Sequence, residues 1–383
     1  MSLRTTLFLL ICAMVLLSFF LHSEARTEAA AQKSFADALE QLKTKHQLPG
    51  IAATAVVGDK VVEIGAAGVR KSGFPEPVTV QDQWHVGSCG KAMTATLAAI
   101  LVESGTLRWE TTVFDALPAF QKEMSPGWKQ VTLEHLLQHQ GGAPENPPPD
   151  LWERACAQKG SPTEQRREFV QALLRTAPES RPRERFQYSN QGYAIAGVIM
   201  EQFTGRAWEE LMRERLFTPL GMVSAGFGAP GKAGAVDQPW GHTGAGKTLE
   251  PVEPGPAADN PPAVGPAGTI HCSIGDWARF CAFHARGAKE NGALLKPESF
   301  RRLHRPTSGG TYALGWDVLK RHWAGGKVLT HSGSNTAWFA TTWIVPGKST
   351  AFVVATNAAD GSAAEACDDA VALLIKRVMG IEP

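Results

Sequence analysis

The sequence Ser88-Cys89-Gly90-Lys91 opens the stretch that decides the fold, because an almost uninterrupted apolar run follows it from residue 92 to residue 102. A helix that is apolar nearly all round is expected to be buried on every side, and Gly105 supplies the left-handed residue at which such helices commonly end. Ser88 and Lys91 share one face of this helix, because residues three apart are neighbours there. A buried lysine tends to lose its proton, and its neutral amine can then take the proton of a serine hydroxyl. The stretch therefore predicts a nucleophile, Ser88, beside its base, Lys91.

The composition is that of an ordinary globular protein. The chain has 383 residues, of which 43% are hydrophobic and 20% charged, so it is long enough for a large core or two subdomains. Its formal net charge is +1, and no run of lysine and arginine stands out. We therefore expect neither nucleic acid nor an anionic surface as a partner.

The N-terminal segment is typical of a secretory signal. A positive charge at Arg4 precedes an apolar run from Leu7 to Leu21, which is short for a membrane span, and small residues follow at Ser23 and Ala25. Residues 1–25 are predicted to be a signal peptide, and the protein to be exported, either periplasmic or secreted. An uncleaved N-terminal anchor is the alternative, and no other membrane association is expected.

The cysteines and histidines give no sign of a disulfide framework or a metal site. Cys12 lies in the predicted signal peptide, and the other five cysteines are an odd number without metal-ligand spacing. An isolated disulfide stays open among Cys156, Cys272, Cys281 and Cys367. Cys89 points about 100° away from Ser88 around a helix and is expected to be a small buried residue. Structural roles are expected for His85, His135, His139 and His271, and no metal or cofactor is predicted.

The order of predicted elements indicates how the chain is organised. Two β-rich runs near the N-terminus, 51–57 and 60–69, are joined at Gly58-Asp59 as a hairpin. The middle of the chain is helical, with a strong helix start at Ser161-Pro162-Thr163-Glu164. Further helices are expected at 30–46, 132–140, 191–203, 208–217, 273–285 and 363–379, and further strands at 312–318, 328–331, 338–345 and 351–355. Residues 144–149 read as a proline-rich loop. The stretch 225–268, rich in glycine and proline, is expected to be a functional loop or lid, or disordered.

Strands at both ends of a chain without βαβ alternation favour an antiparallel sheet built from the two termini. We therefore predict an α+β fold, with an antiparallel sheet flanked by terminal helices and an inserted all-helical lobe. The predicted division is a signal peptide at 1–25, a first part of the α/β lobe at 26–85, a helical lobe with the long loop at 86–265, and a second part of the α/β lobe at 266–383. A small-ligand site is expected in the cleft between the lobes.

Two more short stretches complete a pattern with Ser88 and Lys91. They are Tyr188-Ser189-Asn190, at the start of a predicted helix, and His331-Ser332-Gly333-Ser334, on a predicted strand. Together the three stretches resemble the serine β-lactamase and penicillin-binding-protein superfamily, whose signature combines Ser-x-x-Lys with two such partner motifs. The chain looks most like the branch of class C β-lactamases, DD-peptidases and family VIII esterases. Stretches that also look familiar include residues 131–142, 266–268, 276–280, 315–316 and 355–357, so the resemblance runs from about Phe35 to the C-terminus.

The resemblance implies a β-lactamase/transpeptidase-like fold and a role for each matched residue. Ser88 would form an acyl-enzyme, Lys91 would help to deprotonate it, and Tyr188 would shuttle the proton to the leaving group. How that work divides between Lys91 and Tyr188 stays open. Asn190 would hold Lys91 and a substrate amide. The backbone N–H groups of Ser88 and of Ser334, the latter on an expected edge strand, would form the oxyanion hole.

The residue at 331 departs from the β-lactamase pattern, which has lysine there. His331 is not a fixed cation, so its attraction for a substrate carboxylate is weaker. With Ser332, Gly333 and Ser334, it is predicted to line the substrate site. A small-molecule or peptide substrate with an ester, amide or β-lactam carbonyl is expected, with ester hydrolysis first, D-Ala-D-Ala cleavage next and efficient β-lactam hydrolysis third. A non-catalytic receptor or scaffold is the alternative from another class of protein.

Overall fold

The computed structural model describes residues 34–244, 248–287, 289 and 294–383. The predicted signal peptide, residues 1–25, and the first residues of the helix expected from residue 30 lie outside these ranges. Within them, no helix has the length and apolar character needed to cross a membrane. The predicted domain boundaries stay predictions.

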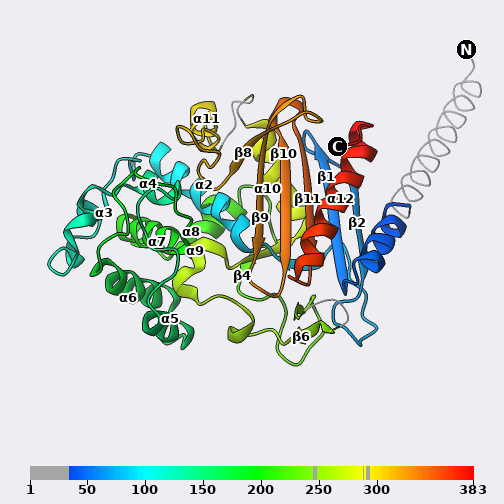
Figure 1. Ribbon diagram of the computed structural model, residues 1–383, viewed down its shortest axis with the longest axis horizontal. Coiled ribbons are helices and arrows are strands. Elements are labelled where there is room, and N and C mark those ends of the chain that lie inside the picture. Colours follow the sequence, from blue (N-terminus) through cyan, green and yellow to red (C-terminus); the bar gives the residue numbers. More distant parts are fainter. Residues whose placement is uncertain (1–33, 245–247, 288, 290–293) are drawn as a thin grey trace, which may run out of the picture.

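The main sheet has six antiparallel strands in the order β2-β1-β11-β10-β9-β8 (Figure 1). Their bounds are Gly50–Val57 for β1, Lys60–Gly68 for β2, Asp317–Arg321 for β8, Gly326–Ser334 for β9, Phe339–Val345 for β10 and Thr350–Thr356 for β11. Strand β1 pairs with β11, with Ala53 opposite Val354, so the two ends of the chain build one sheet. The predicted α+β class and antiparallel sheet are confirmed. The expectation that β9 is an edge strand is wrong, because β8 lies outside it, but β8 pairs only with residues 326–330, so Ser334 lies beyond that pairing.

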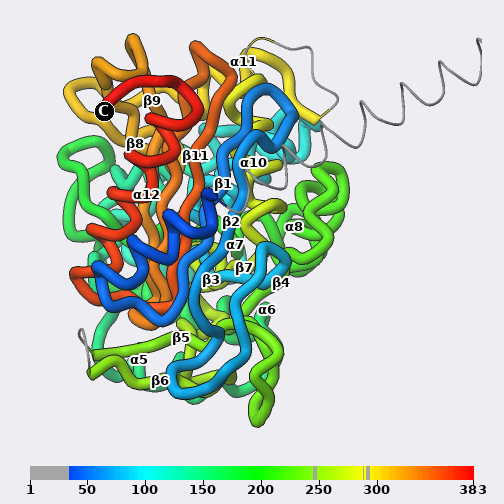
Figure 2. Tube along the Cα trace, turned by 90° about the vertical axis from the view of Figure 1, so that its right-hand side faces the viewer, coloured from blue at the N-terminus to red at the C-terminus, as the bar shows by residue number. Residues whose placement is uncertain are grey.

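Helices cover both faces of this sheet. Residues 34–45 are helical and, with α12 (Gly361–Met379), lie on one face, while α10 (Ile274–Arg286) packs on the other (Figure 2). The contact between the two terminal helices and the sheet is apolar: Phe35 and Leu374 on the helices pack with Ile51 of β1 in one buried cluster. The flanking terminal helices predicted from the sequence are therefore present.

The helical part of the chain lies to one side of the sheet (Figure 1). It consists of α2 (Gly90–Glu103), α3 (Val113–Ala116), α4 (Leu133–Leu137), α5 (Pro149–Cys156), α6 (Pro162–Leu174), α7 (Asn190–Thr204) and α8 (Trp208–Met212), which continues as a π-helical turn at Arg213–Phe217. Helix α2 is buried over most of its length, as its apolar sequence predicts. Helix α6 starts where expected, with Ser161 and Glu164 forming a reciprocal cap.

The segment 225–268 contains short strands and turns joined by irregular chain. Its elements are β4 (Gly226–Phe227), β5 (Gly241–Thr243), β6 (Glu250–Val252) and α9 (Gly265–Gly268). Strands β5 and β6 pair with each other, and β4 joins a second small sheet in the order β3-β7-β4, with β3 at Gln83–His85 and β7 at Ile270–Ser273. Through β4, this segment thus joins the same small sheet as β3, which directly precedes the turn with Ser88.

The local structure differs from the sequence prediction at three places. The strand expected at 312–318 begins only at Asp317, because Ala313 N–H donates to the Trp316 carbonyl at 2.7 Å and Gly315 has a left-handed φ of 80°. The expected proline-rich loop ends in α5, where Pro149 occupies the first helical turn. Helix α11 (Pro297–Leu303) lacked a clear apolar period and was missed.

A buried cation joins the helices beside the sheet. The Arg166 guanidinium of α6 is fully buried and donates to the carboxylates of Glu201 on α7 and Glu209 on α8. It also donates to the carbonyl of Pro262 at 3.1 Å, which ties the helices to the segment 225–268. Burial raises the pKa of Glu201, and the Arg166 charge acts against that shift.

Replacing this cation should destabilise the fold. Arg166→Ala leaves two carboxylates in a buried site without their counter-charge, so the free energy of unfolding should fall by about 3–5 kcal/mol. Urea denaturation measures it. In the control, Arg154→Ala removes an exposed pair with Asp150 and should change stability by less than about 1 kcal/mol. Equal unfolding curves for Arg166→Ala and the parent protein would contradict this account.

Candidate active site

Ser88 and Lys91 lie together at the start of α2. Ser88 belongs to a 3₁₀ turn, Gly87–Cys89, that leads directly into the helix. Lys91 Nζ lies 2.9 Å from Ser88 Oγ, and Lys91 is fully buried. The neighbouring Cys89 thiol is buried on the other side and donates to the His331 carbonyl at 3.3 Å. A half-buried hydroxyl thus contacts an amine that is shielded from bulk water.

Two other groups hold the amine in place. Lys91 Nζ donates to Asn190 Oδ1 at 2.7 Å and to the carbonyl of Ala267 at 2.8 Å. Because burial disfavours the charged form, it lowers the pKa of Lys91 from its ordinary value to about 7. Lys91 can therefore exist as a neutral base near physiological pH.

Tyr188 lies beside this pair, just ahead of α7. Lys91 Nζ is 4.8 Å from the centre of the Tyr188 ring. Burial raises the pKa of Tyr188 above its ordinary value, and a hydrogen bond with Ser88 acts in the opposite direction. Ser189 caps α7 by accepting from Gly192 N–H at 3.3 Å, which places Asn190 in the first turn of the helix, facing Lys91. Because its pKa is raised, Tyr188 keeps its proton at neutral pH while its hydroxyl contacts that of Ser88.

Strand β9 passes directly along the turn that carries Ser88. A methyl group on Gly333 would lie only 2.6 Å from the Ser88 amide nitrogen, so only glycine allows this approach. The hydroxyls of the two flanking serines are engaged elsewhere: Ser332 Oγ lies 3.0 Å from Thr341 Oγ1, and Ser334 Oγ accepts from Thr336 N–H at 2.9 Å. Because a hydroxyl that accepts one hydrogen bond can still donate its proton, Ser334 can offer both its side chain and its backbone to the site.

His331 belongs to the same strand, where its side chain is buried, and burial favours its neutral form. Burial, with a smaller effect from Lys91, lowers its pKa to about 4. Its Nε2 lies 3.4 Å from the Tyr312 hydroxyl. The strand therefore presents no cation at the position where the β-lactamase pattern has lysine.

Sequence reasoning missed an aromatic cluster around the site. The chain has three tyrosines, Tyr188, Tyr193 and Tyr312. The rings of all three lie within 5.3 Å of the ring of His139, centre to centre. His139 was expected to be structural, and its Nδ1 indeed accepts from Ser189 N–H at 3.1 Å. The available signal was Tyr312, just ahead of the familiar-looking Gly315-Trp316.

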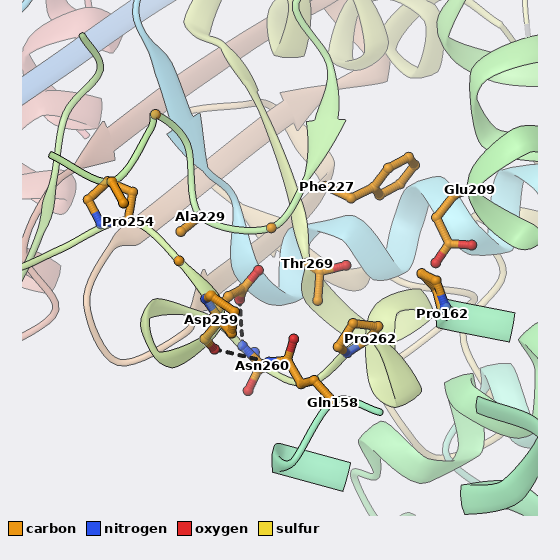
Figure 3. Close-up of a pocket in the computed structure, with 15 residues that line it drawn as sticks. Gln158, Pro162, Glu209, Phe227, Ala229, Pro254, Asp259, Asn260, Pro262 and Thr269 are labelled. Carbon is orange, nitrogen blue, oxygen red and sulfur yellow. Dashed lines mark hydrogen bonds between the residues drawn. The ribbon is translucent and has the colours of Figure 1, made fainter. Parts of the chain in front are cut away.

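A cavity of about 420 Å³ lies under the segment 225–268 (Figure 3). It is lined by residues of that segment, including Phe227, Asp259 and Asn260, and by Glu209 from α8. None of Ser88, Lys91 and Tyr188 lines it. The candidate catalytic residues therefore lie outside this cavity, and Asp259, which lines it, also contacts His85 near Ser88.

The described part of the chain contains no group of three or more histidine, cysteine or acidic side chains arranged to hold a metal ion. Within the same residues the cysteines are free, Cys156 exposed and Cys89, Cys272, Cys281 and Cys367 buried. No disulfide therefore forms among the four cysteines for which pairing was open.

Comparison with known proteins places the chain in a family. The model of the Beta-lactamase family matches residues 35–376, so the chain belongs to that family, as its motifs predict. Penicillin-binding protein 4 of Amycolatopsis lactamdurans is 30% identical over 329 residues, which cover 83% of each chain.

Solved structures agree on the fold. A class C beta-lactamase has a TM-score of 0.73 at 20% identity, over 92% of this chain and 97% of the other. The D-amino acid amidase from Ochrobactrum anthropi SV3 has a TM-score of 0.70 at 18% identity, over 90% of this chain and 99% of the other. The protein is therefore a serine hydrolase of the beta-lactamase family.

The protonation of Lys91 predicts how the reactivity of Ser88 depends on pH. Because the lowered pKa of about 7 makes Lys91 neutral at higher pH, the rate of Ser88 modification by a fluorophosphonate should rise with pH through about 7 and then level off. Mass spectrometry of the intact protein, quenched at intervals between pH 5 and pH 9, measures this rate. A rate that keeps rising towards pH 10, the range of an ordinary lysine, would contradict the assignment.

Proposed function

We propose that the protein hydrolyses ester or amide carbonyls through an acyl-enzyme formed on Ser88. The observation that carries this proposal is the 2.9 Å contact between Ser88 Oγ and a buried amine whose pKa is lowered to about 7. An activated serine of this kind attacks a carbonyl carbon, expels the alcohol or amine, and is released by water in a second step.

In this mechanism Lys91 is the base and Tyr188 the proton donor. A neutral Lys91 keeps two N–H groups for Asn190 and Ala267 and directs its lone pair at Ser88. Tyr188 has a raised pKa, which makes ionised tyrosine a costly base. As its hydroxyl protonates the leaving group, the proton that Lys91 took from Ser88 passes to Tyr188, so both residues return to their starting state. Asn190 holds Lys91 and is placed to bind a substrate amide.

The backbone amides of Ser88 and Ser334 are proposed to bind the developing oxyanion. Support comes from the approach of β9 to the Ser88 turn at Gly333, which brings the two stretches of backbone side by side. Such donors act on charge that develops only in the transition state, so they accelerate the reaction rather than merely tighten binding.

The neutral His331 favours substrates that need no cation at β9. A β-lactam or a C-terminal D-amino-acid peptide carries a carboxylate, whereas a simple ester or amide does not. We therefore place esters and neutral amides first, and efficient β-lactam hydrolysis last. D-Ala-D-Ala cleavage is the second candidate, because the relative that is 30% identical is a penicillin-binding protein.

Export is also part of the proposal, as a periplasmic or secreted enzyme. Its support is the sequence of residues 1–25, with a basic start, an apolar run and small residues before the expected cleavage position. The N-terminal sequence of the protein recovered from expressing cells distinguishes cleavage after about Ala25 from retention of the segment as an anchor.

Removal of the nucleophile tests catalysis. The parent protein should gain the mass of a fluorophosphonate adduct on Ser88 and turn over a p-nitrophenyl ester, whereas Ser88→Ala should lose both. Ester turnover should fall by about 10⁴-fold or more, because the bond-forming atom is gone. Circular dichroism checks that the variant is folded. A folded parent protein without an adduct would instead favour the non-catalytic receptor or scaffold.

A charge change at β9 tests the substrate order. His331→Lys introduces a cation, so acylation by a labelled penicillin should speed up by roughly tenfold or more relative to a neutral p-nitrophenyl ester, the value of one charged hydrogen bond. His331→Gln is the uncharged control. In the parent protein, rates on the ester, a D-Ala-D-Ala peptide and a chromogenic cephalosporin should fall in that order. A cephalosporin turned over fastest by a wide margin would refute this order.

A further inference from the structure

Asp259 is a buried carboxylate that none of the steps above uses. Its side chain is 5% exposed, and it belongs to the irregular segment between β6 and α9. The Oδ1 atom lies 2.9 Å from His85 Nε2, a close approach without hydrogen-bond geometry, and accepts from Asn335 Nδ2 at 3.1 Å and from Asn260 N–H at 2.7 Å. Figure 3 shows Asp259 and Asn260 at the edge of the cavity. Three separate parts of the chain therefore meet at one oxygen atom.

The contact with His85 leads to the nucleophile. His85 Nδ1 accepts from the Gly87 amide at 3.1 Å, and Gly87 directly precedes Ser88. Because Nδ1 accepts, the ring proton of neutral His85 lies on Nε2, on the side of Asp259. The negative charge of a carboxylate 2.9 Å from Nε2 favours the proton on that nitrogen, which leaves Nδ1 free to accept from the Gly87 amide.

The contact with Asn335 leads to the other half of the oxyanion hole. Asn335 directly follows Ser334, and its Nδ2 donates both to Asp259 and to the carbonyl of Ala258 at 3.0 Å. Its Oδ1 accepts from Trp338 N–H at 3.2 Å, so the turn after β9 is held at both ends of this amide. Trp338 in turn packs against His85, with ring centres 5.9 Å apart.

The second carboxylate oxygen of Asp259 adds no hydrogen bond to the described part of the fold. Asp259 Oδ2 is buried and has no hydrogen-bond partner among the residues that the structure describes. Leaving a buried carboxylate oxygen unpaired costs stability. Glu209, whose carboxylate pairs with Arg166, also has one buried oxygen without a partner in the described part of the chain, so the inference rests on the contacts of Asp259 Oδ1 and not on Oδ2.

We propose that Asp259 is a positioning residue that sets the two halves of the oxyanion hole relative to each other, through His85 and Gly87 on one side and Asn335 on the other. This inference rests on the proposed function of Ser88 and deepens it. It also gives the segment 225–268 a part in catalysis, because that segment supplies a carboxylate that contacts both His85 and Asn335.

The test separates the oxyanion hole from general stability. Phenylboronic acid adds to a reactive serine, and its tetrahedral adduct places an oxygen where the oxyanion forms. In Asp259→Ala its dissociation constant should rise by about 10- to 100-fold, since small misplacements of a catalytic group have effects of this size. The kcat for the p-nitrophenyl ester should fall by the same factor, with little change in KM. Asp259→Asn, which keeps the acceptor oxygen, should restore most of both.

Further variants keep the test decisive. Asn335→Asp removes the donor to Asp259 but keeps the acceptor for Trp338, and it should reproduce the loss if Asp259→Ala does not fold. Asp237→Ala removes another aspartate of the same segment, one that accepts from Lys232 N–H at 3.1 Å, and should bind the boronic acid like the parent protein. Unchanged boronic acid affinity in both Asp259→Ala and Asn335→Asp would overturn the proposal, as would an equal loss in Asp237→Ala.

Amide hydrogen exchange at Gly87 gives a readout that needs no catalysis. If Asp259 acts through His85, exchange at Gly87 should be faster in Asp259→Ala than in the parent protein and in Asp237→Ala. A parent protein that neither binds boronic acid nor reacts at Ser88 would refute the proposed function. The exchange at Gly87 would still decide whether Asp259 positions this turn, and unchanged exchange would overturn that role.

Discussion

The burial of one amine is the constraint on which the site depends. Lys91 is fully buried, and its Nζ lies within hydrogen-bond distance of Ser88, Asn190 and Ala267. These partners come from the turn before α2, from the start of α7 and from α9, so three elements must pack around a single nitrogen. An uncompensated charge there would be expensive, and the lowered pKa of Lys91 is the chemical consequence. The apolar sequence of α2 is therefore a condition of the chemistry as well as of the fold.

A second constraint is the approach of the sheet to the same turn. The end of β9 that carries Gly333 is fixed by its pairing with β10, because β8 pairs only with residues 326–330. Gly333 then allows the strand to pass the Ser88 amide at a distance that no side chain would tolerate. A rigid sheet on one side and a buried helix on the other leave the Ser88 turn little freedom. Preorganisation of this kind is what oxyanion stabilisation requires.

Local patterns in the sequence explain how much could be predicted. The burial of α2, the cap at Ser161 and the strands at both ends of the chain follow from periodicity and from residues close in sequence, and the structure has them. The family resemblance named Ser88, Lys91, Tyr188 and Asn190, and the structure brings all four together.

What could not be predicted depends on contacts between distant residues. Nothing near Asp259 in the sequence indicates that it meets His85 and Asn335, and the clustering of Tyr312 with His139 requires the fold. The strand expected at 312–318 failed for a related reason. Its residues have β character, but Gly315 in a left-handed conformation turns the chain so that Trp316 is buried. Tertiary packing overrode local preference there.

The histidine at 331 has a consequence for the division of labour between Lys91 and Tyr188. In a site with lysine at this position, two cations would lie near the tyrosine, and each would favour its ionised form. Here His331 is neutral at physiological pH, since its pKa is lowered to about 4. Lys91 is then the cation closest to Tyr188, and it loses its own charge near neutral pH. As Lys91 becomes neutral it gains the ability to accept the Ser88 proton, and Tyr188 loses the charge that would have helped it to ionise. In the proposed mechanism the same titration that creates the base thus keeps the tyrosine protonated, so a change of one residue on β9 assigns the two roles that the motifs alone leave open.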